Sequence, residues 1–401
     1  MESPKHRTGS LLRLHDCQPS RCSVRIAGPR ENAMNPLMPR LPILSALLLG
    51  LLAVSRTAAV PLEGDRPFDH GDDPNVGLMQ YAKLKQVPEH PPARSLAPLE
   101  LPDKIYHGVL LNTDTQAGFD KRYQQYVSVA GKKPSMIGCF APMWSKGAEL
   151  PLESSLHRLK VIDSVPNVIP FIKLYTGDWD PSGPFLKADD ILSGKEDWRF
   201  IKLAELSKEF GKPYLLSINH EMNGDWFFFS ELYKKQPTDW TAAKFKLVWR
   251  RIHKIFRDHG ADKVAFAWCP GAMGRSFGKY DSINGYKAYY PGDDVVDWVG
   301  ASFYNDVNHY ALDNLAATYP NKPIILAEWG TEPPRGKWYQ PKPYPGDARH
   351  MEMTFEFCKR YPNLKAIIYF YWGKDVDIER VPEQVEVYRK GIADPIFLSN
   401  D

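Results

Sequence analysis

The stretch FIKLAELSKEFGKPYLLSINHE, residues 200–221, joins a helical pattern directly to the pattern of a buried strand. Gly211 and Pro213 separate the two halves and are expected to end the helix. The run YLLSI that follows them is apolar almost throughout, as in a parallel strand that is buried on both faces. The helical half carries apolar residues at spacings of three and four, namely Phe200, Leu203, Leu206 and Phe210.

Similar apolar runs recur on both sides of this unit. With YLLSINHE (214–221) there are eight, and the other seven are IYHGVLL (105–111), SMIGCFAPM (135–143), VIPFIKLY (168–175), VAFAWCP (264–270), VDWVGASFY (296–304), PIILAEWG (323–330) and AIIYFYW (366–372). A second helical face, from Phe245 to Phe256, precedes the fifth run and ends at Gly260. Eight strands alternating with helices predict an α/β fold, a (β/α)8 TIM barrel. A doubly wound open sheet is the alternative, but HGVLLNTDTQ (107–116) has no glycine-rich phosphate turn.

Composition and charge are those of an ordinary globular protein, with 43% hydrophobic and 25% charged residues in a chain of 401. The formal net charge of +3 is concentrated in residues 1–33, where six basic residues face three acidic ones. The rest of the chain is close to neutral, which gives no reason to expect a nucleic-acid partner.

An apolar segment near the start predicts export. Arg40 precedes the run LPILSALLLGLLAV (41–54), and Thr57-Ala58-Ala59 follows with small residues. We interpret residues 34–59 as a signal peptide cleaved after Ala59, with translation starting at Met34 or Met38 and residues 1–33 as an over-called start. An uncleaved anchor is the alternative, although the run is short for a membrane span. A secreted or periplasmic protein without stable membrane insertion is expected.

The remaining chain divides by composition. Residues 60–103 are rich in proline and charge and predict a linker or an N-terminal extension, whereas 104–401 are expected to form a single barrel domain. Three cysteines lie in apolar segments of that domain, Cys139, Cys269 and Cys358. Their spacing fits neither a disulfide framework nor a zinc site, so buried free thiols are expected, with one disulfide as the alternative.

Two of the eight apolar runs have a glutamate at or near their carboxyl ends. The fourth ends in Asn219-His220-Glu221, and the seventh ends in Glu328-Trp329-Gly330. In a TIM barrel the active site lies at the carboxyl ends of the strands. Two carboxylates at that mouth are what a glycosidase needs, one as acid/base and one as ionised nucleophile. The alternative is that both form structural ion pairs with lysine or arginine.

Other chemistries lack their motifs. His220 and Glu221 begin the segment HEMNG (220–224), in which Gly224 stands where an H-E-x-x-H zinc helix has its second histidine. The pattern GRSFG (274–278) has the G-x-S-x-G spacing, but it stands apart from the apolar run VAFAWCP (264–270) rather than at its end, and Cys139, Cys269 and Cys358 have no histidine within five residues in sequence. No metal and no cofactor are therefore expected.

The segments around these carboxylates resemble glycoside hydrolase family 26, the β-mannanase-like retaining glycosidases of clan A. The stretch 193–229 contains HEMNG followed by Trp226, five residues after Glu221. The resemblance continues, in order, through VWRRIHKIFRDHGADKVAFAWCPG (248–271), AYYPGDDVVDWVGASFY (288–304), NKPIILAEWG (321–330) and YFYW (369–372). It covers about residues 105–375.

The resemblance implies a role for each matching residue. Glu328 would be the nucleophile and Glu221 the general acid/base of a retaining mechanism. Tyr304 would contact the nucleophile, and His220 would lie near the scissile sugar.

Aromatic residues would form the sugar-binding surface. By the same resemblance, Trp226 and Trp372 would be stacking platforms, with packing at the barrel rim as the alternative. Four more residues at or near strand ends fit packing or binding equally well, namely Trp144, Trp179, His107 and Trp268.

The chain departs from the family pattern at several positions. Ser217 stands where many members carry arginine, Gly271 where asparagine is common, and Ser302 where an acidic residue is common. Phe228 and Phe229 replace frequent tryptophans.

The resemblance and the departures together set the expected partner. It is a β-linked polysaccharide or oligosaccharide, with mannan first and glucan or xylan as alternatives, cleaved by a monomer in endo or exo fashion. A non-catalytic glycan-binding barrel is the alternative from another class.

The predicted cleavage site can be tested directly. N-terminal sequencing of the exported protein should begin at or near Val60, because the small residues before it suit signal peptidase. A mature protein that still carries residues 1–33 would contradict this interpretation.

Overall fold

The computed structural model describes residues 94–178, 180, 183–234, 236–271, 285–304, 310–331, 346–373 and 376–400. The predicted signal peptide and most of the predicted linker lie outside these residues and stay predictions. Within the described ranges, no helix has both the length and the apolar character needed to span a membrane.

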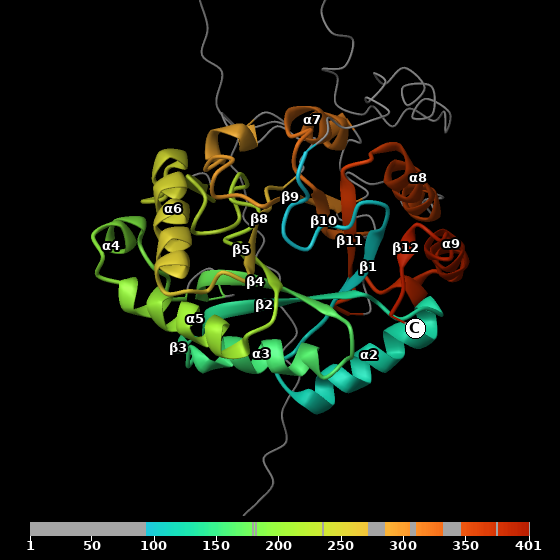
Figure 1. Ribbon diagram of the computed structural model, residues 1–401, viewed down its shortest axis with the longest axis horizontal. Coiled ribbons are helices and arrows are strands. Elements are labelled where there is room, and N and C mark those ends of the chain that lie inside the picture. The colour runs from blue at the N-terminus through green and yellow to red at the C-terminus, as the bar shows by residue number, and fades with distance from the viewer. Residues whose placement is uncertain are drawn as a thin grey trace, which may run out of the picture. The chain divides into compact units, whose positions relative to one another are not determined.

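Eight parallel strands form a closed barrel, seen end-on in Figure 1. They are β1 (Ile105–Leu110), β2 (Met136–Ser145), β4 (Ile169–Asp178), β5 (Tyr214–Ile218), β8 (Val264–Trp268), β9 (Trp298–Tyr304), β10 (Ile324–Gly330) and β11 (Leu364–Phe370). Around the ring the order is β1, β11, β10, β9, β8, β5, β4, β2, and β2 pairs with β1 again. The predicted TIM barrel is confirmed, and each of the eight predicted runs overlaps one of its strands.

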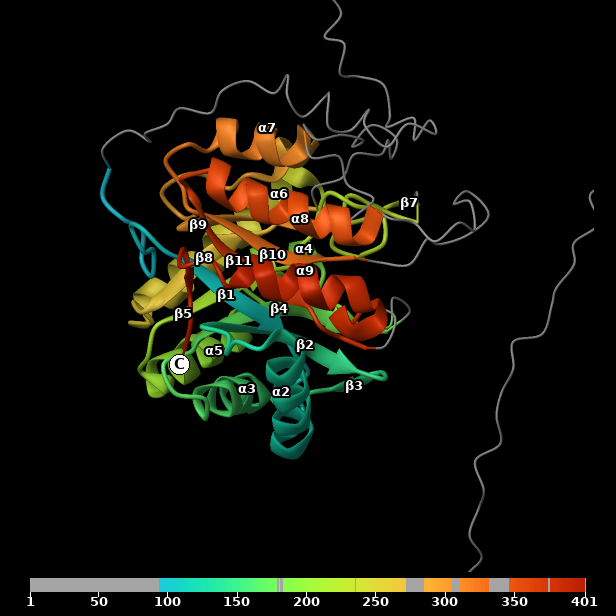
Figure 2. The ribbon, with the colours of Figure 1, turned by 90° about the vertical axis from the view of Figure 1, so that its right-hand side faces the viewer.

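Helices surround the barrel (Figures 1 and 2). They are α2 (Gln116–Ala130), α3 (Glu153–Asp163), α4 (Ala188–Leu192), α5 (Asp197–Phe210), α6 (Ala242–Asp258), α7 (Tyr310–Thr318), α8 (Gly346–Arg360) and α9 (Pro382–Ile392). Gly211 ends α5 in the left-handed conformation, φ 70°, which glycine adopts without steric cost. The side chain of Thr241 caps the amide of Lys244 at the start of α6, whose apolar stripe packs on the barrel.

Short elements decorate the barrel. They are the strands β3 (Ala148–Glu149), β6 (Leu232–Tyr233), β7 (Gln236–Pro237) and β12 (Phe397–Leu398), and the 3-10 turns η2 (Gly285–Tyr289) and η3 (Ile378–Arg380). β3 folds back antiparallel on the end of β2, and β12 pairs with the start of β1.

Residues 94–103 cover the amino ends of the strands. The indole Nε1 of Trp298 donates to Pro98 O at 2.8 Å, and the Tyr106 hydroxyl donates to Leu99 O at 2.9 Å. Lys365 Nζ donates to Pro102 O at 2.5 Å. This end of the barrel is therefore closed, which leaves the carboxyl ends for the site.

The three cysteines are free and buried, as predicted. The position of Glu221 differs from the expectation that it ends a strand. β5 ends at Ile218, so Glu221 follows three residues later. Asn219 and Glu221 both adopt left-handed backbone conformations, with φ of 49° and 55°, which cannot continue a strand.

The closure of the barrel can be tested by a substitution at Gly108, because β1 pairs there with both β2 and β11. A Cβ at this position would lie 2.4 Å from Ile368 Cδ1 and 2.9 Å from the backbone oxygen of Met136. Gly108→Ala should lower the free energy of unfolding by about 1–3 kcal/mol through overpacking, measured by denaturant titration. Gly373→Ala, whose Cβ would have nothing within 4 Å, is the control, and an equal effect of both changes would contradict the argument.

Candidate active site

Glu328 lies inside β10, near the carboxyl end of that strand, and is 5% exposed. The pairing of β10 with β9 shifts register between Leu326 and Glu328. Such bulges redirect side chains and are common beside active sites. Burial of a carboxylate is costly unless its charge is compensated, so its partners decide its state.

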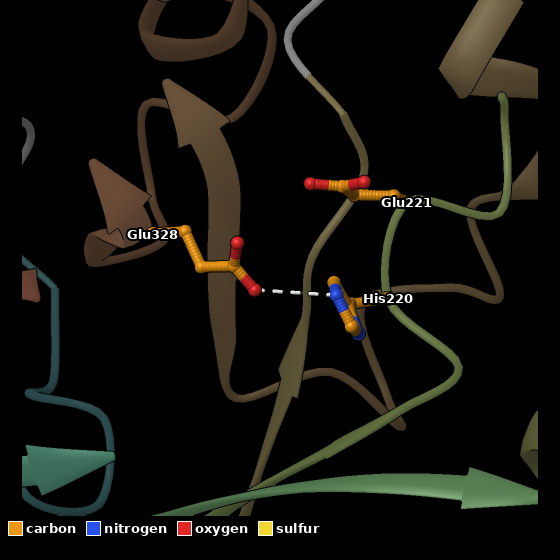
Figure 3. Close-up of side chains that lie close together, drawn as sticks. All are labelled: His220, Glu221 and Glu328. Carbon is orange, nitrogen blue, oxygen red and sulfur yellow. Dashed lines mark ion pairs between the residues drawn. The ribbon is translucent and has the colours of Figure 1, made fainter. Parts of the chain in front are cut away.

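Three side chains bind the two oxygens of Glu328. Lys173 Nζ donates to Oε1, and His220 Nε2 lies 3.2 Å from the same atom (Figure 3). The Tyr304 hydroxyl donates to Oε2 at 2.7 Å. These contacts hold the carboxylate of Glu328 in one orientation. Figure 3 shows that it points away from its own backbone, toward the side on which Glu221 lies.

The surroundings of Glu328 favour its ionised form. Burial raises its pKa, but the charge of Lys173 and the hydrogen bond from His220 outweigh burial and hold the pKa well below the usual range. Burial and then the charge of Lys173 lower the pKa of His220, against the opposing pull of the two glutamates. A neutral His220 therefore donates Nε2–H to Glu328, since a carboxylate only accepts.

Glu221 is held by a loop rather than by a strand. Its backbone amide donates to Cys269 O at 2.8 Å, next to the end of β8. Asn223 and Gly271 exchange two hydrogen bonds of 2.8 Å, one from the Asn223 side chain and one to it. The side-chain oxygen of Asn219 accepts from the amide of Thr176 at 3.0 Å on β4. These bonds tie the loop to the strands on both sides.

The two carboxylates face each other. A ligand atom from each of His220, Glu221 and Glu328 lies within 4.8 Å of the other two. Carboxyl groups about 5–5.5 Å apart suit attack by one of them on the sugar, whereas inverting enzymes leave about 6.5–9.5 Å for a water molecule. The same three residues could in principle bind a metal ion, but the ammonium group of Lys173 on Glu328 would repel a cation there.

Two predicted platform residues flank these carboxylates. Trp226 is half-buried, and its indole Nε1 donates to Glu221 Oε2 at 2.9 Å. Trp372 is 39% exposed, two residues after β11, and packs edge-on against Phe140 with ring centroids 5.2 Å apart. All six predicted site residues thus fall at the carboxyl end of the barrel, and their roles stay predictions.

Three of the residues that fitted packing or binding equally well prove to be packing residues. Trp268 is fully buried against Tyr286, Tyr290 and Tyr319. His107 is fully buried and bonds to hydroxyl groups of α2 and α9. Trp144 is 8% exposed and packs on Arg199, while Trp179 lies outside the described residues.

Lys173 is the site residue that sequence reasoning missed. It lies on β4 in register with Ser217 of β5, so a cation is present one strand away from the position where the resemblance led us to expect arginine. The available signal was a lysine inside the apolar run VIPFIKLY, because an unpaired buried charge is costly. The other departures are buried: Ser302 pairs in register with Glu328, and Phe228 and Phe229 pack in the core.

A sequence profile of Glycosyl hydrolase family 26 matches residues 199–341, the segment that carries both carboxylates. The chain is similar to this family over that segment. The earlier resemblance is thereby confirmed for residues 199–341.

Relatives of this chain have names that give different substrates. Endoglucanase H of Acetivibrio thermocellus is 28% identical over 51% of the chain and 23% of its own length. A β-1,3-xylanase of a Vibrio species is 23% identical over 53% of the chain and 50% of its own length. A mannan endo-1,4-β-mannosidase of Bacillus subtilis is 31% identical over 34% of the chain and 35% of its own length. The chain thus spans half or less of the length of these relatives.

Solved structures support the fold of this chain. The Bacillus subtilis mannanase BCman has a TM-score of 0.53 and 20% identity, over 75% of this chain and 88% of that one. A GH26A protein of Muricauda has a TM-score of 0.52 and 19% identity, over 74% of this chain and 92% of that one.

Removing Lys173 should change the pH profile of catalysis. If Glu328 acts as its anion, activity is present above its pKa and lost as pH falls through it. Lys173→Met removes a cause that lowers this pKa and leaves burial, which raises it. The acidic limb of kcat/KM should therefore move to higher pH, and kcat/KM at neutral pH should fall by roughly 10²-fold because the carboxylate is misplaced.

Lys365→Met is the matched control, since Lys365 is also a buried lysine but lies at the opposite end of the barrel. It should leave the acidic limb in place. If Lys173→Met also left the limb unmoved, Lys173 would have no part in ionising Glu328.

Proposed function

We propose that this chain is a retaining endo-β-glycanase that cleaves β-1,4-linked polysaccharide, with mannan as the favoured substrate. One observation carries the proposal. Two carboxylates face each other within 4.8 Å, and one of them is buried against Lys173, which keeps it ionised. The match to the family 26 profile and the relatives named mannosidase, endoglucanase and xylanase support a glycanase.

The geometry suits a double displacement. The Glu328 carboxylate attacks the anomeric carbon while Glu221 gives its proton to the departing glycosidic oxygen, which leaves a glycosyl-enzyme ester. Glu221, now an anion, then takes a proton from water as that water attacks the anomeric carbon. Glu328 is released as its anion, so charge and protons balance. Lys173, His220 and Tyr304 position Glu328 through this cycle.

Trp372 supports a saccharide substrate. Trp372 is 39% exposed and packs edge-on against Phe140, beside the carboxylate pair, where a pyranose could stack on its ring. Glucan and xylan are alternative substrates, because relatives named endoglucanase and β-1,3-xylanase each match about half of this chain.

A glycan-binding barrel without catalysis is the competing proposal. Such a protein would gain nothing from a buried ion pair at the carboxyl end of its barrel, because burying two charges is expensive. The enzyme proposal is favoured for that reason. We also propose that the protein is exported and acts as a monomer, since polysaccharides do not cross membranes and residues 34–59 have the pattern of a signal peptide.

The two carboxylates should fail in different ways when replaced. Glu328→Ala should abolish hydrolysis of mannan, glucan and xylan, because no glycosyl-enzyme can form. Glu221→Ala should lower polysaccharide hydrolysis by roughly 10²–10⁴-fold but lose less on aryl glycosides, whose leaving groups need no proton. Product analysis by chromatography measures both effects.

Azide distinguishes the two roles. Added azide should rescue Glu221→Ala and give a β-glycosyl azide, because it attacks the glycosyl-enzyme in place of water. An α-azide from this variant would exchange the two assignments. Glu356→Ala, which removes an exposed carboxylate of α8, is the control and should act like the wild type. Full activity of both active-site variants would contradict the roles assigned to the two carboxylates, whereas glycan binding without hydrolysis by the wild type would support the glycan-binding barrel.

A further inference from the structure

A second exposed tryptophan lies away from the carboxylate pair. Among the tryptophans in the described ranges, only Trp372 and Trp198 are exposed, by 39% and 53%. Trp372 belongs to the candidate active site. Trp198 stands in the first turn of α5, and nothing in the proposed reaction uses it.

The indole of Trp198 rests on a rigid support. The guanidinium carbon of Arg199 lies 4.3 Å from the centroid of the Trp198 ring and 5.0 Å from that of Trp144. Arg199 is itself buried, and it bonds to Glu196 at 2.7 Å and to Glu149. Because two carboxylates hold Arg199 in place, its guanidinium group fixes the Trp198 ring that stacks on it. The rest of the indole stays open.

Trp198 forms one wall of an open groove of about 560 Å³, within the usual size range for ligand sites. The groove has an apolar side and a polar side. The carboxylate of Glu153 and the ammonium group of Lys202 lie 3.4 Å apart on the polar side. The apolar side is formed by Leu150, Pro151 and Leu152.

The groove opens at the same end of the barrel as the carboxylates. β2 carries Phe140, which contacts Trp372 and His220, and four residues later Trp144, which contacts Arg199. Four residues of strand span about 13 Å. β2 then turns into β3, which lies at the end of the β2 arrow in Figure 2. Glu149 of β3 lines the groove. The groove therefore lies outward from the active site along one strand.

We propose that the Trp198 groove is a second glycan-binding site, which holds a distant part of the polysaccharide that the carboxylate pair cleaves. The proposal rests on the proposed function for the identity of the ligand. The indole offers a flat surface for the apolar face of a pyranose ring. Glu153 and Lys202 offer an acceptor and a donor for sugar hydroxyls at the edge of that ring.

Binding can be measured without turnover in a Glu328→Gln background. Affinity electrophoresis in gels with soluble mannan, mixed-linkage glucan or xylan gives the dissociation constant for each polymer. Adding Trp198→Ala should weaken retention by roughly two- to tenfold, the range expected for loss of one aromatic contact. Leu247→Ala, which removes a 55% exposed side chain on α6, is the matched control and should not change retention.

Two surface variants distinguish loss of the binding site from misfolding. Glu153→Ala and Lys202→Ala change the polar side of the groove and should also weaken retention, with unchanged melting temperatures. Equal retention by the wild-type background and all groove variants would overturn the proposal.

The outcome separates the two claims. If no glycan is hydrolysed by the wild type but retention depends on Trp198, the proposed reaction fails and the second site stands. If glycan is hydrolysed and Trp198→Ala is retained as well as Leu247→Ala, the groove is no glycan site, and an exposed surface for a protein partner becomes the better explanation.

Discussion

The buried contact between Lys173 and Glu328 is the constraint on which the site depends. β4 and β10 stand opposite each other in the ring of eight strands, so this ion pair crosses the interior of the barrel. It forms only if every strand between them keeps its register and the barrel closes. Losing one partner of such a pair leaves an uncompensated charge and typically costs about 3–5 kcal/mol. Fold and charge state are thus fixed together.

The groups around this pair divide the work of positioning. Tyr304 binds the oxygen of Glu328 that Lys173 leaves open, and His220 adds a neutral donor. Phe140 covers Lys173, whose Nζ lies 5.2 Å from its ring, and the same ring supports Trp372. One aromatic side chain therefore connects the charged interior to the surface where a sugar would stack.

Sequence patterns were enough for the strands, the two helical faces and the carboxylate pair, because each leaves a periodic or terminal signal. Lys173 was missed although a lysine inside an apolar run was a signal, because its partner Glu328 lies on the opposite strand and far away in sequence. Sequence patterns also could not separate His107 and Trp268 from cleft residues. Parallel strands are buried on both faces, so a continuous apolar run does not reveal which side chains point inward. The end of β5 was misplaced because left-handed Asn219 leaves little trace in composition.

The two carboxylates are anchored in mechanically different ways. Glu328 belongs to a central strand, whereas Glu221 sits on a loop pinned by Asn223 and Gly271. Loops accept insertions and substitutions that a barrel strand does not. In the proposed reaction, natural variation can therefore adjust how a leaving group departs, and which sugars are accepted beside it, while Glu328, the proposed nucleophile, stays untouched. This asymmetry offers a physical route by which one barrel diversifies its substrates without reinventing its chemistry.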